Sequence, residues 1–380
     1  MKKILIVVDT SRATGRKFLS GVEKYLSTLT DWEVFVQPPD YLKESASDYD
    51  FDFKYLKPDG LLIRDAFKIP ELLETDTTKV VSDTLHELIP GTSTIMTNSQ
   101  NIGQMAADYF TGLGFYNFAY CGFSEFEWSQ KRLQAFKKAL EDTEVNSFYN
   151  YLSDSPENNV HQSERLNIAE WLKKLPRPIC IFACNDDRAV SVLEACKIAE
   201  INVPEEIAVL GVDNDELICN LSSPPLSSIE LDFETAGYAA AQHLNNLIEK
   251  TGDYKIIKVS PLDIIERRST DILAIDDEEV VSAIVFIRKN FDKPIQTIDV
   301  VEATCLSKRD LEKRFKATLK RTIKSEIERL RINLIKNKLL NSSKSIHQIA
   351  LELKFTDPEH FSRYFRNATG ESPKQFRMEK

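Results

Sequence analysis

Side chains suited to a small polar ligand occur in this sequence next to short apolar runs. Asp9, Asn185 and Asp213 each follow such a run, and the carboxyl ends of parallel strands are where α/β sheets bind small molecules. Carboxylates, amides and guanidinium groups pair with adjacent hydroxyls, and an indole can cover an apolar ring face. The pattern therefore predicts a site for a small polyol. The candidate ligand-contacting residues are Asp9, Arg12, Arg16, Trp128, Arg132, Asn185 and Asp213.

Two other interpretations of these residues are open. Ser11 or Thr14 would also serve as a simple helix cap after the first run. Asp9 and Asp213 would also suit an acid–base pair of an enzyme. However, the sequence contains no Ser-His-Asp or H-E-x-x-H arrangement, no phosphate loop, and no histidine near the candidate strand ends. We therefore expect no catalytic residue, no metal site and no cofactor.

A second set of chemically capable side chains lies in the last hundred residues. Net charge is −10, but residues 1–275 carry 27 Lys and Arg against 43 Asp and Glu, whereas residues 276–380 carry 22 against 16. A basic part joined to an acidic one indicates that only the basic part meets a polyanion. Arg and Lys can reach phosphates or guanine edges, and Glu can accept from cytosine. The outer faces of two expected helices carry Lys308, Arg309, Glu312, Lys313 and Lys316, and Glu359, His360, Ser362, Arg363 and Arg366.

The elements that must position the first set alternate between short apolar runs and amphipathic stretches, which is typical of parallel sheets with crossover helices. The expected strands are Ile4–Val8, Val34–Gln37, Gly60–Ile63, Lys79–Ser82, Phe118–Cys121, Ile179–Ala183, Ala208–Val212 and Ile256–Ser260. The expected helices are Arg16–Leu29, Ile102–Leu113, Ser129–Leu140, Ala189–Glu200 and Thr235–Thr251.

The strand pattern stops after Arg268, and the remainder is expected to be helical. The expected helices are Val280–Asn290, Thr297–Thr304, Lys308–Lys316, Thr322–Asn341, Ile346–Leu353 and Pro358–Ala368. They form two similar units, each a short helix, a tight turn and a second helix with an apolar inner face. The helix between them carries one expected buried stripe, Ile323, Ile327, Leu330 and Leu334, and basic residues on its other faces, Lys324, Arg329, Arg331, Lys336 and Lys338. We expect domains at 1–272 and 280–380, joined by an acidic linker at 273–279.

The segment SIHQIALELKFTDPEHFSRYFRNATGESPKQFR resembles the second helix-turn-helix of the AraC family of regulators. Its matching residues are Ile346, Ile349, Ala350, Phe355, Phe361, Phe365, Gly370, Ser372, Pro373 and Arg377. The family's turn glycine is replaced by Cys305 in the first unit and Lys354 in the second, so we expect strained or differently shaped turns. By position, the resemblance implies base-reading roles for Arg309, Glu312, Lys313, Glu359, His360 and Arg363.

The first 270 residues resemble the periplasmic-binding-protein-like core of the LacI/GalR regulators, with two α/β lobes hinged around a cleft. The run Gly211–Asn214 with the downstream Pro225–Ile229, and the pair Asn185 and Asp186, carry that resemblance. By position, Arg132, Asn185 and Asp213 match its polyol-contacting residues. The resemblance also implies Asn98 or Asn101 at the rim of that site.

A LacI-like sensor followed by an AraC-like tail resembles the XylR-type regulators of xylose operons. The resemblance implies a transcription activator with D-xylose as effector and with operator DNA, RNA polymerase and a second copy of the chain as partners. A regulator of the same architecture that responds to another sugar is the alternative. The chain has no apolar run of membrane-spanning length, no signal peptide and no C-x-x-C pair among its six cysteines, so we expect a cytoplasmic location.

Overall fold

The computed structural model describes the chain apart from residues 29–30, 37–55, 65–72, 83–91, 142, 154–160, 273–274, 276, 320, 343, 356 and 379–380. The chain divides into two compact units. The first comprises Met1–Asp108 and Asn117–Asp271, and the second comprises Tyr109–Tyr116 and Ile272–Lys380. The first unit contains two α/β lobes, each with its own sheet, and the second is helical, which confirms the expected fold class.

The first lobe is built on a parallel sheet with the order β11–β5–β4–β3–β1–β2. Its strands are β1 (Lys2–Val7), β2 (Trp32–Val36), β3 (Gly60–Ile63), β4 (Thr78–Ser82), β5 (Ser93–Thr97) and β11 (Ile256–Val259). Helices α1 (Ala13–Leu26) and α8 (Phe233–Ile248) pack tightly against each other. A Cβ at Gly21 would lie 1.9 Å from the carbonyl oxygen of Glu234, so this contact requires glycine.

The second lobe contains a six-stranded sheet with the order β12–β10–β9–β8–β6–β7, parallel except for the antiparallel pair of β10 and β12. Its strands are β6 (Asn117–Phe123), β7 (Ser147–Ser153), β8 (Ile179–Ala183), β9 (Ile207–Asp213), β10 (Ser227–Leu231) and β12 (Pro261–Ile265). Its helices are α3 (Ser99–Gly112), α4 (Glu127–Ala139), α5 (His161–Leu172), α6 (Asp186–Ile198) and α7 (Glu216–Leu221), with a short 3-10 helix, η5 (Arg268–Thr270).

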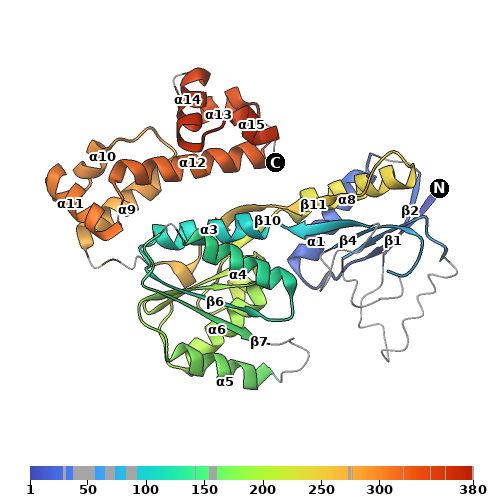
Figure 1. Ribbon diagram of the computed structural model, residues 1–380, viewed down its shortest axis with the longest axis horizontal. Coiled ribbons are helices and arrows are strands. Elements are labelled where there is room, and N and C mark those ends of the chain that lie inside the picture. The colour runs from blue at the N-terminus through green and yellow to red at the C-terminus, as the bar shows by residue number, and fades with distance from the viewer. Residues whose placement is uncertain are drawn as a thin grey trace. The chain divides into compact units, whose positions relative to one another are not determined.

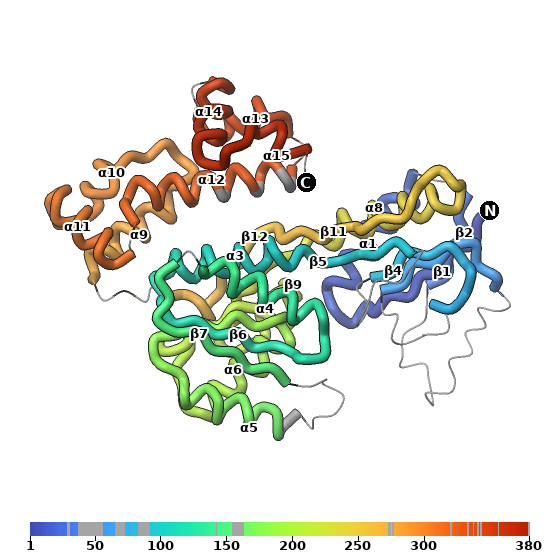
Figure 2. Tube along the Cα trace, in the orientation of Figure 1, coloured from blue at the N-terminus to red at the C-terminus, as the bar shows by residue number. Residues whose placement is uncertain are grey.

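The chain passes between the two lobes three times, after β5, after β10 and after β11. Figure 2 shows the last passage, where β11 runs on into β12. The passages are joined to one another, because Asn98 N donates to Val259 O at 2.9 Å and Asp232 N donates to Ser260 O at 2.9 Å. These contacts link the three connecting segments where a hinge between the lobes was expected.

The helical unit consists of two groups joined by the long helix α12 (Ile323–Asn341), as Figure 1 shows. The first group comprises α9 (Glu278–Asn290), α10 (Thr297–Glu302) and α11 (Lys308–Leu319), and the second comprises α13 (Ile346–Glu352), α14 (Pro358–Thr369) and α15 (Pro373–Met378). Each group has its own apolar core, one containing Phe315 and the other containing Phe361 and Phe365. Helix α9 begins at Glu278 within the expected linker, of which residues 273–274 and 276 lie outside the described part of the chain.

One expectation for α12 is incomplete and another is wrong. The expected stripe does pack, with Ile323, Ile327 and Leu330 in or against the first core and Leu334 against the second. However, the helix also buries Ile332, Ile335 and Leu339 on another side, in the second core. The buried face changes because the two helical groups pack around different sides of the helix. Arg331, expected on the outer face, is 6% exposed and donates from its guanidinium to two backbone carbonyls. None of the helices in the described residues is both long and apolar enough to cross a membrane.

Candidate effector and DNA-binding sites

The turn after β9 presents Asp213 at the end of a buried strand, as expected from the sequence. Asp213 has a φ of 109° and Asn214 a φ of 47°, so two consecutive residues other than glycine adopt left-handed backbone. Such conformations are costly and persist where the surrounding structure holds them. The turn is therefore a constrained element, and constrained backbone is often found at binding sites.

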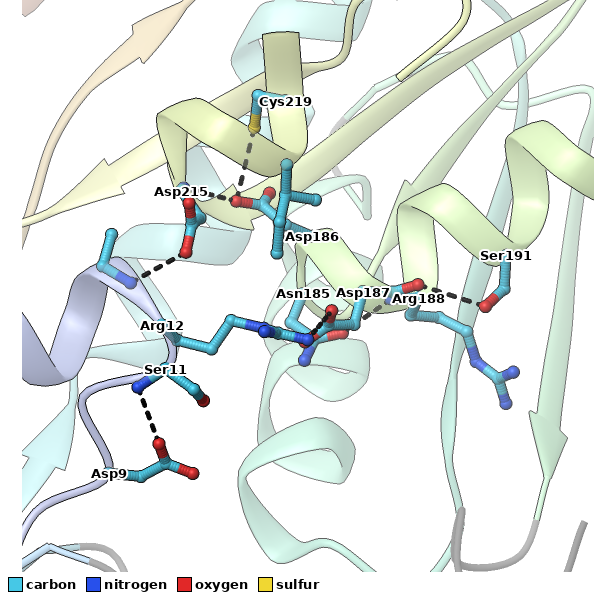
Figure 3. Close-up of polar contacts among 12 residues, drawn as sticks. Asp9, Ser11, Arg12, Asn185, Asp186, Asp187, Arg188, Ser191, Asp215 and Cys219 are labelled. Carbon is cyan, nitrogen blue, oxygen red and sulfur yellow. Dashed lines mark hydrogen bonds and ion pairs between the residues drawn. The ribbon is translucent and has the colours of Figure 1, made fainter. Parts of the chain in front are cut away.

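Asp186, at the start of α6, is hydrogen-bonded to this turn, and Figure 3 shows its contact with Asp215. Its carboxylate accepts from Ser228 Oγ at 2.5 Å and from the backbone N of Asp215 at 2.8 Å. Ser228 Oγ in turn accepts from the backbone N of Asn214 at 3.0 Å. A Cβ at Gly211 would lie 2.3 Å from Asp186 Oδ1, so glycine is needed there for the carboxylate to fit. The sequence analysis placed Asp186 and Ser228 in segments that resemble the LacI/GalR core, but it did not predict that they support the turn.

The carboxyls of Asp186 and Asp213 both have raised pKa values. Burial raises the pKa of Asp186, and the neighbouring Asp213 raises it further, against the hydrogen bond from Ser228. Burial also raises the pKa of Asp213, whereas Arg132 and Arg64 lower it. Both carboxyls therefore bind protons at higher pH than exposed aspartates do. Arg64 directly follows β3 and, like Asp213, could have been found as a polar residue at a strand end.

Arg132 and Trp128 are brought together on α4, as expected from their spacing. The guanidinium carbon of Arg132 lies 4.9 Å from the centre of the Trp128 ring. Arg132 is 3% exposed; its Nη1 donates to the carbonyl of Cys184, and its Nη2 lies 3.5 Å from Thr97 Oγ1. Its buried Nε has no hydrogen-bond partner among the described residues. A buried N–H donor without a partner is unfavourable, so the arrangement leaves this atom available to a ligand.

Asn185 follows β8 and forms the N-cap of α6. Its Oδ1 accepts from the backbone N of Arg188 at 2.9 Å, which satisfies one of the free N–H groups of the helix start. This oxygen is therefore used by the fold, and the amide nitrogen is the part of the side chain left to contact a ligand.

The segment after β1 places Asp9, Arg12 and Arg16 at the start of α1. Asp9 Oδ1 accepts from Ser11 N at 2.8 Å, and Arg16 Nη1 donates to the carbonyl of Thr10 at 2.7 Å. The N-cap position of α1 is Arg12 and no side chain caps the helix, so the alternative in which Ser11 or Thr14 provides the cap is wrong.

Contacts between the lobes involve the same segment. Arg12 forms an ion pair with Asp187 of α6 at 2.9 Å, shown in Figure 3, and Arg16 lies 3.7 Å from Asp215. Asp215 also accepts from the backbone N of Ala13 at 2.8 Å. Residues that were expected to contact a ligand from the first lobe therefore also join the two lobes.

Asn98 and Asn101 lie at the start of α3. Asn98 Oδ1 accepts from the backbone N of Asn101 at 3.2 Å, and the side chain of Asn101 is half-buried. The amide of Asn98 is therefore used to cap the helix, and Asn101 is the better candidate for a ligand contact.

No group of three or more His, Cys, Asp or Glu side chains is arranged to hold a metal ion among the described residues. All six cysteines are free thiols, and Cys305 is the exposed one.

The second helix of each group in the helical unit has a buried face and an exposed charged face. On α11, Leu311 and Phe315 are buried, and on α14, Phe361 and Phe365 are buried. The expected DNA-contacting residues on the opposite faces are all exposed: Arg309, Glu312, Lys313, Glu359, His360 and Arg363. Asp357 caps α14 by accepting from the backbone N of His360 at 2.6 Å. Each of these helices therefore has a charged face exposed to solvent, opposite its buried face.

The turns that lack glycine differ from each other, in line with the expectation. Lys354 has a φ of 58°, and the turn after α13 closes with Lys354 N donating to Leu351 O and Phe355 N donating to Ala350 O, both at 3.0 Å. This is the hydrogen-bond pattern in which glycine usually occupies the Lys354 position. Cys305 has a negative φ, so the first turn has another shape.

Comparison with known proteins finds a known type of domain in each of the two parts of the chain that carry these residues. Residues 107–270 match the family model of the periplasmic binding protein-like domain, and residues 300–379 match that of a helix-turn-helix domain. The xylose operon regulatory protein of Escherichia coli K12 is 30% identical over 99% of this chain and 96% of its own length. The corresponding protein of Haemophilus influenzae is 28% identical over 99% of this chain and 98% of its own length.

A solved structure of a xylose-binding transcription activator, xylR, is also similar, with 27% identity and a TM-score of 0.61 over 99% of this chain and 97% of that one. The similarity thus covers the lobes and the helical unit in the same order. The chain belongs to the family of xylose operon regulatory proteins, and it is a DNA-binding transcription regulator, not an enzyme.

Proposed function

We propose that this chain is a D-xylose-dependent activator of pentose catabolic genes. The observation that carries the proposal is the position of Arg132, which is buried over the Trp128 ring with its Nε unpaired among the described residues. A guanidinium donor next to an aromatic face suits a ring that carries adjacent hydroxyls. The choice of D-xylose comes from the names of the related regulators.

In this proposal, Asp213 accepts from sugar hydroxyls, and Arg132 and the Asn185 amide nitrogen donate to sugar oxygens. Trp128 covers the apolar face of the ring. The first lobe and the connecting segments supply the remaining candidates: Asp9, Arg12, Arg16 and Asn101.

We further propose that the helical unit reads operator DNA through α11 and α14, the recognition helices of its two groups. Arg309, Glu312 and Lys313 on α11 and Glu359, His360 and Arg363 on α14 are the proposed base-reading residues, and two such helices suit successive major grooves ~34 Å apart. The working form is a cytoplasmic homodimer that contacts RNA polymerase at the promoter.

The sugar acts by favouring one arrangement of the two lobes. A ligand shifts such an equilibrium only by its different affinity for the two states. D-xylose between the lobes would favour the joined arrangement and thereby change how two copies present their helical units to DNA.

The proposal is tested by calorimetric titration of the full-length protein with D-xylose, L-arabinose, D-ribose and D-glucose. We expect D-xylose to bind most tightly, and Arg132→Met to weaken it roughly 10- to 100-fold through lost charged hydrogen bonds. Lys131→Met, the neighbouring partly exposed position, is the matched control and should bind as the wild type does. No binding of any sugar, or equal binding by Arg132→Met, would contradict the proposal.

A further inference from the structure

We propose that the turn Asp213–Asp215 passes the effector signal to the segment that leaves the first unit, and that the contact between Asn214 and Arg267 is the coupling contact. The inference rests on the proposed function and adds to it a mechanism of regulation. Arg267 lies in the segment after β12 that leads directly into the helical unit.

Three consecutive side chains of this turn reach three different places. Asp213 is the proposed sugar contact. Asn214 Oδ1 accepts from Arg267 Nη2 at 3.0 Å. Asp215 accepts from the backbone N of Ala13, on the opposite lobe, at 2.8 Å. One short piece of backbone therefore connects the proposed sugar contact, the contact with the first lobe and the segment after β12 that contains Arg267, which we call the exit segment.

The conformation of the turn depends on contacts with residues outside it. Asp213 and Asn214 both have left-handed backbone, which residues other than glycine rarely adopt. The conformation is held by hydrogen bonds from outside the turn, through Asp186, Ser228 and Arg267. A changed contact at Asp213 or Asp215 would therefore shift the backbone of the turn, and with it Asn214, the residue that binds Arg267.

Arg267 is well placed to carry the change onward. Besides Asn214, its guanidinium donates to Asn220 Oδ1 at 2.8 Å and to the carbonyl of Leu226 at 2.9 Å. Its backbone N donates to Ser227 Oγ at 2.7 Å, and the same hydroxyl donates to its carbonyl oxygen at 2.9 Å. The position of the exit segment is therefore set by the loop and strand beside the turn.

The variant that isolates this contact is Asn214→Gly. Glycine adopts a φ of 47° without strain, so the substitution removes the acceptor for Arg267 and leaves the backbone of the turn permitted. Asn220→Ala is the matched control, because it removes another acceptor of the same arginine without touching the turn. Arg267→Met tests the contact from the other side, in case Asn214→Gly lowers the thermal stability of the protein.

The experiment measures the affinity of each full-length variant for D-xylose with and without a DNA duplex selected from random sequences by the wild type. The ratio of the two affinities is the coupling between the sites, and typical values are ~5- to 150-fold. We expect wild type and Asn220→Ala to share one value, and Asn214→Gly and Arg267→Met to fall to a ratio near unity while still binding D-xylose.

The outcomes separate the two proposals. Wild-type coupling in Asn214→Gly or in Arg267→Met would overturn the inference and leave the proposed function intact. An equal loss of coupling in Asn220→Ala would also overturn it, because Asn214 would then have no special role. A wild type with no coupling for D-xylose would overturn the proposed function and the inference together.

Discussion

Arg331 and Leu353 join the long helix of the DNA-binding part to its second helical group, because Arg331 Nη2 donates to the carbonyl of Leu353 at 2.8 Å. Arg331 Nη1 donates to the carbonyl of Lys293, next to the first group, at 2.6 Å. The guanidinium also lies 4.8 Å from the centre of the Phe355 ring. One buried arginine on α12 therefore fixes both helical groups to the same helix.

Replacing Arg331 with methionine keeps an apolar stem but leaves these carbonyls without their donor. Loss of a buried hydrogen bond costs ~1–3 kcal/mol, so we expect the helical unit to melt earlier in calorimetry. Operator affinity should fall as well, because the two recognition helices lose their fixed relation. Lys324→Met, an exposed position on the same helix, should change neither quantity. Unchanged melting and DNA binding in Arg331→Met would refute this role.

The raised pKa of Asp186 predicts that the free energy of unfolding depends on pH. Its pKa in the folded protein is raised by burial and by Asp213, so the folded state binds a proton that the unfolded state has released above pH ~4. Stability should therefore fall as pH rises from ~4 through the raised pKa, by up to ~1.4 kcal/mol per pH unit for one proton. Asp186→Asn removes the group and should flatten this fall.

The control for that measurement is Asp253→Asn, which removes an exposed carboxyl. Chemical unfolding of the three proteins between pH 4 and neutral pH gives the comparison. If the slope in Asp186→Asn equals the slope in the control, Asp186 does not hold an extra proton.

The turn at Lys354 is strained by the residue that occupies it. Glycine at this position should raise the stability of the helical unit by roughly 0.5–1 kcal/mol, because a side chain at positive φ is unfavourable. Cys305→Gly should lower stability by a similar amount, since the negative φ there gives glycine no advantage and only frees the unfolded chain. Thermal unfolding of both variants checks the pair, and a change of the same sign in both would count against this explanation.

Strands buried on both faces could be predicted almost to the residue. The continuous apolar runs of β3 and β8 were expected at Gly60–Ile63 and Ile179–Ala183 and are observed there. The strand β5 was missed because its polar residues are buried: Ser93 is 0% exposed, and its hydroxyl lies 2.7 Å from His243 Nε2. In a sequence, a serine indicates an exposed position unless its hydrogen-bond partner elsewhere in the chain is known.

The same reason limits prediction of the site. Asn185 and Asp213 could be expected from their places at strand ends, but the role of Asp186 could not. Its partners Ser228 and Asp215 come from other strand ends, and only the folded sheet brings them to its carboxylate. The burial of Arg331 depends in the same way on partners on both sides of α12 in the sequence, Lys293 and Leu353.

Arg363 tests how the second recognition helix reads DNA. The residue is exposed on α14, opposite the buried Phe361 and Phe365, where an arginine can reach either a guanine edge or a phosphate. If it reads a base, Arg363→Ala should lose ~1–3 kcal/mol of discrimination at one operator position and bind substituted operators there as well as the original. Binding to a panel of single-base operator variants measures this, with Arg366→Ala as a comparison of equal charge change. A uniform loss on all sequences, with a weaker salt dependence, would make Arg363 a phosphate contact instead.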